Sequence, residues 1–190
     1  ANGAALIVSE KHDLPLVSLS VTFLGGANQF EPDGRQGVAS LAASLLTEGT
    51  KTRDGEALSN ALQLLGTSIS ASVGGESGSI GFQSTSAKFP DTLALLADML
   101  VNSTFPEQGL ERLRGQRLVA LTPARSQPGA IASRVFPRIL YGNDHPYGRV
   151  VTEASIKRIT REDVVAFHKT NFWPGRATAT VSVYTSDAPR

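Results

Sequence analysis

One segment constrains the fold more than any other, and it reads Gly37-Val-Ala-Ser-Leu-Ala-Ala-Ser-Leu-Leu-Thr-Glu-Gly-Thr50. Leu41, Leu45 and Leu46 recur at helical spacing, so they predict a helix that packs in the core through one side. On its own, the segment also fits an ordinary amphipathic helix rich in Ala, Leu and Ser. The residues at its polar positions indicate whether it is an ordinary amphipathic helix or the helix of a functional site.

Ser40 and Ser44 lie four positions apart, so both project from the same face of this helix. Two zinc ligands on a helix have this spacing, but protein zinc sites are built from Cys, His or carboxylate groups and not from neutral hydroxyls. A hydrolytic zinc site also needs a base for the metal-bound water, and the methyl group of Ala43 cannot accept a proton. The geometry of a zinc helix is present without its ligands or its base.

The segment resembles the signature of the M16 peptidase family (pitrilysin, insulinase and mitochondrial processing peptidase). In that signature a Gly-x-Ala leads into His-x-x-Glu-His, and a Gly-Thr follows. The resemblance implies that Ser40 and Ser44 stand at the two His positions and Ala43 at the position of the general base. The residues of the signature that remain are Gly37, Ala39, Gly49 and Thr50.

M16 enzymes complete the site with a carboxylate on a downstream helix whose pattern resembles Glu-Arg-Glu-Arg-x-x-x-x-x-Glu. The matching segment here is Glu111-Arg-Leu-Arg-Gly-Gln-Arg-Leu-Val-Ala120. It puts Ala120 at the ligand position and Leu113 at a supporting Glu. The resemblance therefore implies a peptidase domain with no catalytic residues and no metal or cofactor of its own, whose degenerate positions are Ser40, Ala43, Ser44 and Ala120.

Other parts of the chain extend the resemblance from roughly residue 3 to residue 180. The opening Gly3–Gly26 looks like the first hairpin of the family. Asp144-His-Pro-Tyr-Gly-Arg149 and the following Ser155–His168 match its late loop and helix. Each of these short motifs alone is a weak indication of the family, but their combination is specific. The resemblance therefore extends beyond one helix.

Hydrophobic periodicity predicts the remaining elements. In 15–24, the residues Val17, Leu19, Val21 and Phe23 alternate with polar positions, which is typical of a half-buried strand. The expected strands are 4–9, 15–24, 67–73, 78–87 and 177–183. The expected helices besides 37–50 are 54–65, 90–102, 106–122, 128–140 and 161–170, the last opened by a capping box of Thr160 and Asp163. Residues 27–36 are expected to form a loop.

This order predicts an α+β fold, a two-layer sandwich of a mixed, mostly antiparallel sheet with helices packed on it. The resemblance implies the M16 metallopeptidase-like fold in particular. With no internal repeat and no long linker, residues 1–190 are expected to form a single domain that lacks the zinc site. A further domain of the full-length protein is expected to be missing.

The strand pair at 67–87 is a candidate peptide-binding edge, because the resembled family uses an edge strand here to hold an extended substrate. An exposed edge offers unpaired N–H and C=O groups, so binding by strand addition needs no catalytic residue. Serines are expected to make one face of the pair polar, and they are Ser68, Ser70, Ser72, Ser79, Ser84 and Ser86. The alternative is a solvated sheet face beside a Gly-rich turn.

Neither the histidines nor the serines suggest another active site. His12, His145 and His168 have no His or acidic partner three or four positions away, so no metal pair is predicted. A nucleophilic role for Ser40 or Ser44 would lack the Gly-x-Ser-x-Gly elbow, and a hydroxyl within a helix usually bonds to a carbonyl of the preceding turn.

Composition excludes several classes of function. A net charge of +1 gives no electrostatic footprint for nucleic acid, and no run of 18 or more apolar residues suggests a membrane span. The chain has no Cys, so it can form neither disulfides nor thiolate metal sites. Its 190 residues, 41% of them hydrophobic, suffice for one core.

The leading hypothesis is a non-catalytic domain of an M16-type zinc protease, which helps to form the substrate chamber. Its expected partner is a zinc-bearing M16 homologue or domain that hydrolyses peptides, with zinc only in that partner. The alternative is a scaffold or peptide-binding module that no longer works with a protease. A third reading puts an active zinc site elsewhere in the same polypeptide. For localisation, the resemblance suggests a bacterial periplasm or cell envelope, with the cytoplasm as an alternative.

Overall fold

The computed structural model describes residues 5–11, 15–122, 127–172 and 174–184. Its strands are β1 (Ala5–Lys11), β2 (Leu16–Leu24), β3 (Ile69–Val73), β4 (Ser77–Thr85) and β5 (Ala177–Tyr184). Its α-helices are α1 (Ala27–Phe30), α2 (Val38–Leu45), α3 (Gly55–Leu64), α4 (Phe89–Asn102), α5 (Glu107–Ala120), α6 (Pro128–Tyr141), α7 (Glu153–Arg158) and α8 (Arg161–Asn171). Short 3-10 helices are η1 (Ser86–Lys88), η3 (Pro146–Gly148) and η4 (Pro174–Arg176). Within these ranges, no helix combines the length and the apolar character that crossing a bilayer requires.

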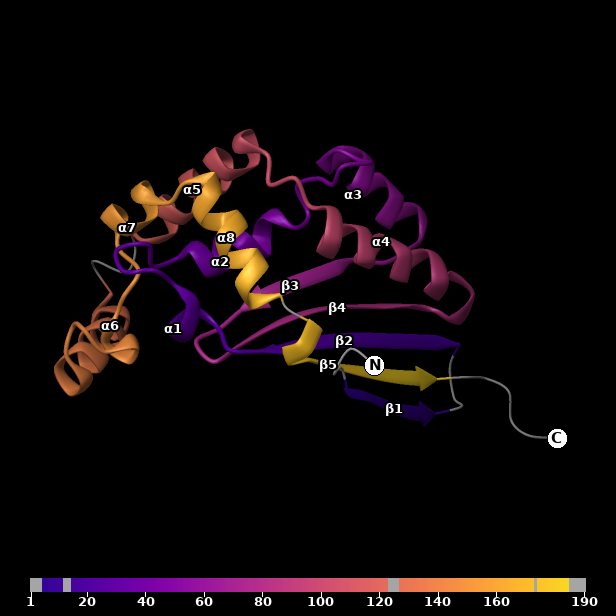
Figure 1. Ribbon diagram of the computed structural model, residues 1–190, viewed down its shortest axis with the longest axis horizontal. Coiled ribbons are helices and arrows are strands. Elements are labelled where there is room, and N and C mark those ends of the chain that lie inside the picture. Colours follow the sequence, from indigo (N-terminus) through magenta and orange to yellow (C-terminus); the bar gives the residue numbers. More distant parts are fainter. Residues whose placement is uncertain (1–4, 12–14, 123–126, 173, 185–190) are drawn as a thin grey trace.

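The five strands form one sheet in the order β1-β5-β2-β4-β3. β1 pairs with β5 in parallel, whereas the other neighbouring strands pair antiparallel. Figure 1 shows the helices gathered over one face of this sheet, with α6 at one end of the molecule. The predicted two-layer α+β sandwich with a mixed, mostly antiparallel sheet is therefore confirmed.

The predicted first hairpin is wrong, although its strands exist. β1 and β2 do not pair with each other, because β5 lies between them and bonds to both. Two strands that follow each other in the chain usually pair, but the last strand of this chain returns to the middle of the sheet. His12, which follows β1 in the chain, lies outside the described residues.

The sheet turns one face to the helices and the other to solvent. Val17, Leu19 and Phe23 of β2 are buried, as the period-2 pattern predicts. The polar face of β3 and β4 carries Ser72 and Ser79, whose hydroxyls lie 3.1 Å apart. The serines predicted for this face do not all lie on it, however.

Ser84 is buried rather than on the polar face, with only 4% of its surface exposed. It has the same parity along β4 as Ile80 and Phe82, so the pleat directs it toward the helices with them. Ser86 belongs to η1, beyond the end of β4. The position of a serine in the alternating pattern of the strand, and not the presence of many serines in the segment, therefore determines which face of the sheet it lies on.

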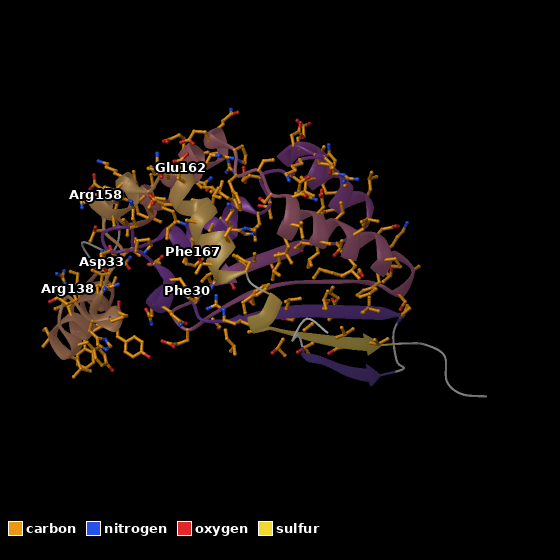
Figure 2. The ribbon with its side chains drawn as sticks, viewed as in Figure 1. Phe30, Asp33, Arg138, Arg158, Glu162 and Phe167 are labelled. Carbon is orange, nitrogen blue, oxygen red and sulfur yellow. The ribbon has the colours of Figure 1, made fainter. Side chains whose placement is uncertain are left out.

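Helix α2 is the centre of the core. The side chains of Leu41, Leu45 and Leu46 have no exposed surface, which confirms that this helix packs through its apolar side. It contacts β3 below it and the helices α5 and α8 beside it. Phe167 of α8, labelled in Figure 2, is buried in the same cluster.

Two helices were missed in the sequence. Residues 27–36 were expected to form a loop, but Ala27–Phe30 form the single turn α1. The second is α7, which begins with a capping box of Thr152 and Ser155. The capping box predicted for α8, from Thr160 and Asp163, is present. The capping box of α7 was not recognised in the sequence, because its third helical position is Ser155 and not an acidic residue.

His168 on α8 packs between two aromatic rings. Its imidazole is stacked on Phe172, with ring centroids 5.2 Å apart, and meets Phe105 edge-on at 5.1 Å. Burial lowers the pKa of His168, although a hydrogen bond to the backbone of Leu100 partly opposes this. The neutral imidazole is therefore the form that the fold favours.

The free energy of unfolding should fall as the pH drops below about 6.5, where an unperturbed His takes up a proton. The unfolded chain then binds the proton, whereas the folded chain resists it down to its lowered pKa, so stability present at neutral pH is lost within this window. Urea unfolding between pH 5 and pH 8 measures the effect. His168→Phe should flatten the dependence, and a slope equal to that of the wild type would contradict the assignment.

Candidate functional site

The start of α2 is held by a carboxylate from the preceding loop. Gly37 precedes the helix with φ of 105°, a conformation open mainly to glycine. Oε1 of Glu31 accepts hydrogen bonds from the backbone N–H groups of Gly37 and Ala39, both at 2.9 Å. These groups have no partner within the helix, so Glu31 serves as its N-terminal cap.

Glu31 was not singled out in the sequence. The only available signal was an acidic residue a few positions before an expected helix, a position that suits the helix dipole. Burial raises the pKa of Glu31, while its two backbone hydrogen bonds and the nearby Arg149 lower it in part. A carboxyl group is present beside the helix, but its Oε1 is engaged in capping.

The three degenerate positions on α2 have structural partners. The hydroxyl of Ser40 donates to the carbonyl of Gly37 at 3.0 Å, as expected for a serine in the first turns of a helix. Ala43 is buried, with 2% of its surface exposed. Oγ of Ser44 accepts a hydrogen bond from Arg117 of α5 at 3.1 Å.

The downstream helix α5 approaches α2, and Arg117 makes the hydrogen bond between them. Ala120 is the exposed last residue of α5, and Leu113 packs half-buried against the core. The group that meets Ser44 is the guanidinium of Arg117, one turn before Ala120. Arg117 has no acidic partner within the described ranges.

These side chains do not fit a zinc ion. Two hydroxyls and a methyl group offer no metal ligand, and the guanidinium beside them is always positively charged. Across the part of the chain that the structure describes, no group of three or more His, Cys, Asp or Glu side chains could hold a metal ion. The contacts that these side chains make in the structure are hydrogen bonds and packing.

A cleft opens beside Ser40, at the end of β3 that leads into the turn to β4. Its volume is about 260 Å³, and its walls include Glu31, Ser40, Val73 and Arg149. A second cavity of about 520 Å³ lies at the other end of β3, where Ser68 and Ile69 face α3 and the ion pair of Glu48 with Arg112. β3 is an edge of the sheet, so a polar edge runs between two hollows.

The turn between β3 and β4 is fixed over the first cleft. Asn28 of α1 donates to the carboxylate of Glu76 at 3.0 Å, and the backbone of α1 bonds to Gly74 and Gly75. Hydrogen bonds from Asn28 and Tyr147 lower the pKa of Glu76. The turn, α1 and η3 therefore form one connected rim.

His145 belongs to this rim and has a structural role. It is stacked on Tyr141 with ring centroids 5.3 Å apart, and its Nδ1 accepts the backbone N–H of Tyr147. Tyr147 meets both rings edge-on. Since neither His145 nor His168 has an acidic group or a second His as partner among the described residues, both pack as aromatic rings.

Comparison with known proteins gives a consistent set of similarities. The family model of insulinase (peptidase family M16) matches residues 6–147. A "Non-peptidase homolog YmxG" of Helicobacter pylori is 24% identical over 160 residues, which cover 84% of this chain and 37% of that protein. A "Probable mitochondrial-processing peptidase subunit beta" of Schizosaccharomyces pombe is 24% identical over 170 residues, covering 87% and 36%.

The similarity extends to solved structures. The crystal structure of a peptidase M16 inactive domain from Pseudomonas fluorescens has a TM-score of 0.88 and 27% identity, and the match covers 99% of this chain and 45% of that one. The chain thus spans less than half the length of these relatives.

Proposed function

The chain belongs to the insulinase family of M16 peptidases, and from this premise we propose that it is a non-catalytic domain of an M16-type zinc protease. In this role it helps to form the substrate chamber and pairs with a zinc-bearing M16 domain that hydrolyses peptides. The chain itself holds no zinc, which is expected only in the partner domain. The likeness to an inactive M16 domain and to a non-peptidase homologue supports the non-catalytic part of this proposal.

One observation carries the proposal. α2, which the sequence pattern assigns to the position of the family's zinc helix, is largely buried, but its half-buried side carries Ser40 and Ser44, and the hydroxyl of Ser44 is bonded to Arg117. A cation beside these positions opposes metal binding, while the burial of Leu41 and Leu45 in the core supports a role of α2 as scaffold. A non-catalytic domain of this kind needs the helix for its core but does not need the zinc ligands.

The purified chain is expected to contain no stoichiometric zinc and to cleave no peptide. When the chain is co-expressed with a zinc-bearing M16 homologue of the same genome, we expect a complex whose peptidase activity depends on the partner's His-x-x-Glu-His helix. Metal analysis and a peptide cleavage assay measure both results. Stoichiometric zinc that disappears in the Ser40→Ala, Ser44→Ala double variant would overturn the proposal.

A second candidate function is a peptide-binding module that works without a protease. The polar edge of β3 between its two cavities favours it, because strand addition uses backbone groups alone. The two candidates differ in the partner that the chain retains. A complex with a zinc-bearing M16 homologue supports the first, and specific binding of unfolded peptides by a chain that forms no such complex supports the second.

A further inference from the structure

Two hollows adjoin each other between α6 and the segment that leads into α7. The larger has a volume of about 350 Å³ and the smaller a volume of about 150 Å³. Arg138, Val150 and Thr152 line both hollows, so the two share a wall. The described residues that line them include neither the serines of α2 nor any residue of the edge strand β3. They therefore lie apart from the clefts described above at the two ends of β3.

The larger hollow has apolar walls. Leu121 follows α5, Ile131 and Val135 belong to one face of α6, and Val150 precedes α7. Ile131 and Val135 are 41% and 44% exposed, whereas Ile139, on another side of α6, is 78% exposed. Small-molecule pockets are typically lined by apolar side chains and have volumes of about 300–1,000 Å³. These walls therefore suit the aliphatic part of a small ligand.

The smaller hollow is polar. Its walls include Arg138, Arg149, Gln36 and Asn143, whose side chains carry many N–H donors. Arg138 uses its Nε–H in a hydrogen bond of 2.7 Å to Asn143, and Arg149 is paired with Asp33 at 2.8 Å. Figure 2 shows Asp33 and Arg138 at the same end of the molecule. Since no acidic residue is among the described residues that line this hollow, it suits a negatively charged head group.

Positive charge remains where the two hollows meet. Arg134 and Arg138 lie four positions apart on α6, line the larger hollow, and form no ion pair within the described ranges. Arg134 donates to the backbone carbonyl of Val151. Glu153, on the same wall, is paired with Lys157 at 2.7 Å, and its charge opposes a head group with two negative charges. A carboxylate has one charge, and its two oxygens match the N–H groups of a guanidinium.

We propose that the two hollows form one binding site for a small carboxylate with an aliphatic tail. The carboxylate lies in the smaller hollow at the guanidinium of Arg138, and the tail lies in the larger hollow against Ile131 and Val135. Arg138 lines both hollows, so it stands where the head of the ligand joins its tail. Such a molecule has two sources, a free fatty acid and the C-terminal residue of a peptide. The inference goes beyond the proposed function and does not depend on it.

The test titrates the chain with sodium octanoate in a calorimeter. We expect saturable binding of one octanoate per chain. Acetate, which lacks the tail, and octylammonium, which carries the opposite charge, should show no saturable binding. Arg138→Gln and Ile131→Glu should each weaken the binding of octanoate by about tenfold or more, because the first removes the charge that meets the carboxylate and the second places a charge against the tail.

Matched controls apply the same substitutions to residues that line neither hollow. Ile139→Glu changes another exposed isoleucine of α6, and Arg158→Gln removes an exposed arginine of α7. Both variants should bind octanoate as tightly as the wild type. Ile131 and Arg138 are exposed as well, so all four substitutions leave the core intact. Circular dichroism of each variant checks that it is folded.

Three results would overturn the inference. They are the absence of saturable octanoate binding, equal binding of octylammonium, and an affinity that neither Arg138→Gln nor Ile131→Glu changes. Tighter binding of octyl phosphate than of octanoate would also overturn it, because the head group would then be a phosphate. None of these results concerns zinc or a partner domain, so the inference and the proposed function fail separately.

A last comparison distinguishes the two sources of the carboxylate. A short peptide that ends in leucine is titrated with its C-terminus free and with its C-terminus amidated. If the free form binds more tightly than octanoate and the amide does not bind, the site takes the end of a peptide. If octanoate binds more tightly than the peptide, the site takes a free fatty acid. Both results support a site for a carboxylate with an apolar tail.

Discussion

Replacing Gly37 with Ala is expected to lower the free energy of unfolding by about 2–5 kcal/mol. Gly37 has φ of 105°, so any side chain there strains the backbone. An added Cβ atom would also lie 2.5 Å from Cδ1 of Ile156 and 3.3 Å from Cγ1 of Val151. Because Ile156 is buried, it can move aside only by disturbing the packing of α7. Urea denaturation at pH 7 measures the loss.

Gly115→Ala is the matched control for this substitution. Gly115 lies within α5, is exposed, and has nothing within 4 Å of the position of a Cβ atom. An alanine there should raise stability by about 0.5–1 kcal/mol, because glycine is a poor helix former. If Gly37→Ala were as stable as the wild type, the conformation that leads into α2 would be different from the one described.

Local sequence patterns were sufficient to predict most of the fold. Leu41, Leu45 and Leu46 alone identified the core side of α2, because helical spacing determines which side chains share a face. The first hairpin was predicted wrongly because strand pairing depends on residues that are distant in the chain. The pairing of β5 between β1 and β2 depends on the last strand of the chain, and no pattern within residues 3–26 contains that information.

The candidate site shows the same division. Spacing along α2 predicts that Ser40 and Ser44 share one face of the helix; in the structure both are half-buried, and one bonds to Gly37 and the other to Arg117. Which residue of α5 faces Ser44 depends on how two helices pack, and one turn separates Arg117 from the predicted Ala120. The assignment of Ala120 to a lost ligand position therefore remains a prediction from the family pattern.

Glu31→Ala is expected to lower the free energy of unfolding by about 2–4 kcal/mol at pH 7. One carboxylate oxygen accepts the N–H groups of both Gly37 and Ala39, and its removal leaves two donors at the start of a buried helix without a partner. The effect should be largest on α2 itself. Hydrogen exchange at the amides of Gly37 and Ala39, read together with urea denaturation, checks both the size and the location of the loss.

Glu31→Gln separates the hydrogen bonds of this group from its charge. The amide oxygen of Gln can accept the same two N–H groups, so the variant should remain within about 1 kcal/mol of the wild type. Burial raises the pKa of Glu31, so the folded chain binds a proton more tightly than the unfolded chain. The contribution of Glu31 to stability should thus increase as the pH falls through the raised pKa, and Gln should remove this dependence. If Gln were as damaging as Ala, the negative charge at the N-terminus of α2, and not the shared oxygen, would be what holds the helix.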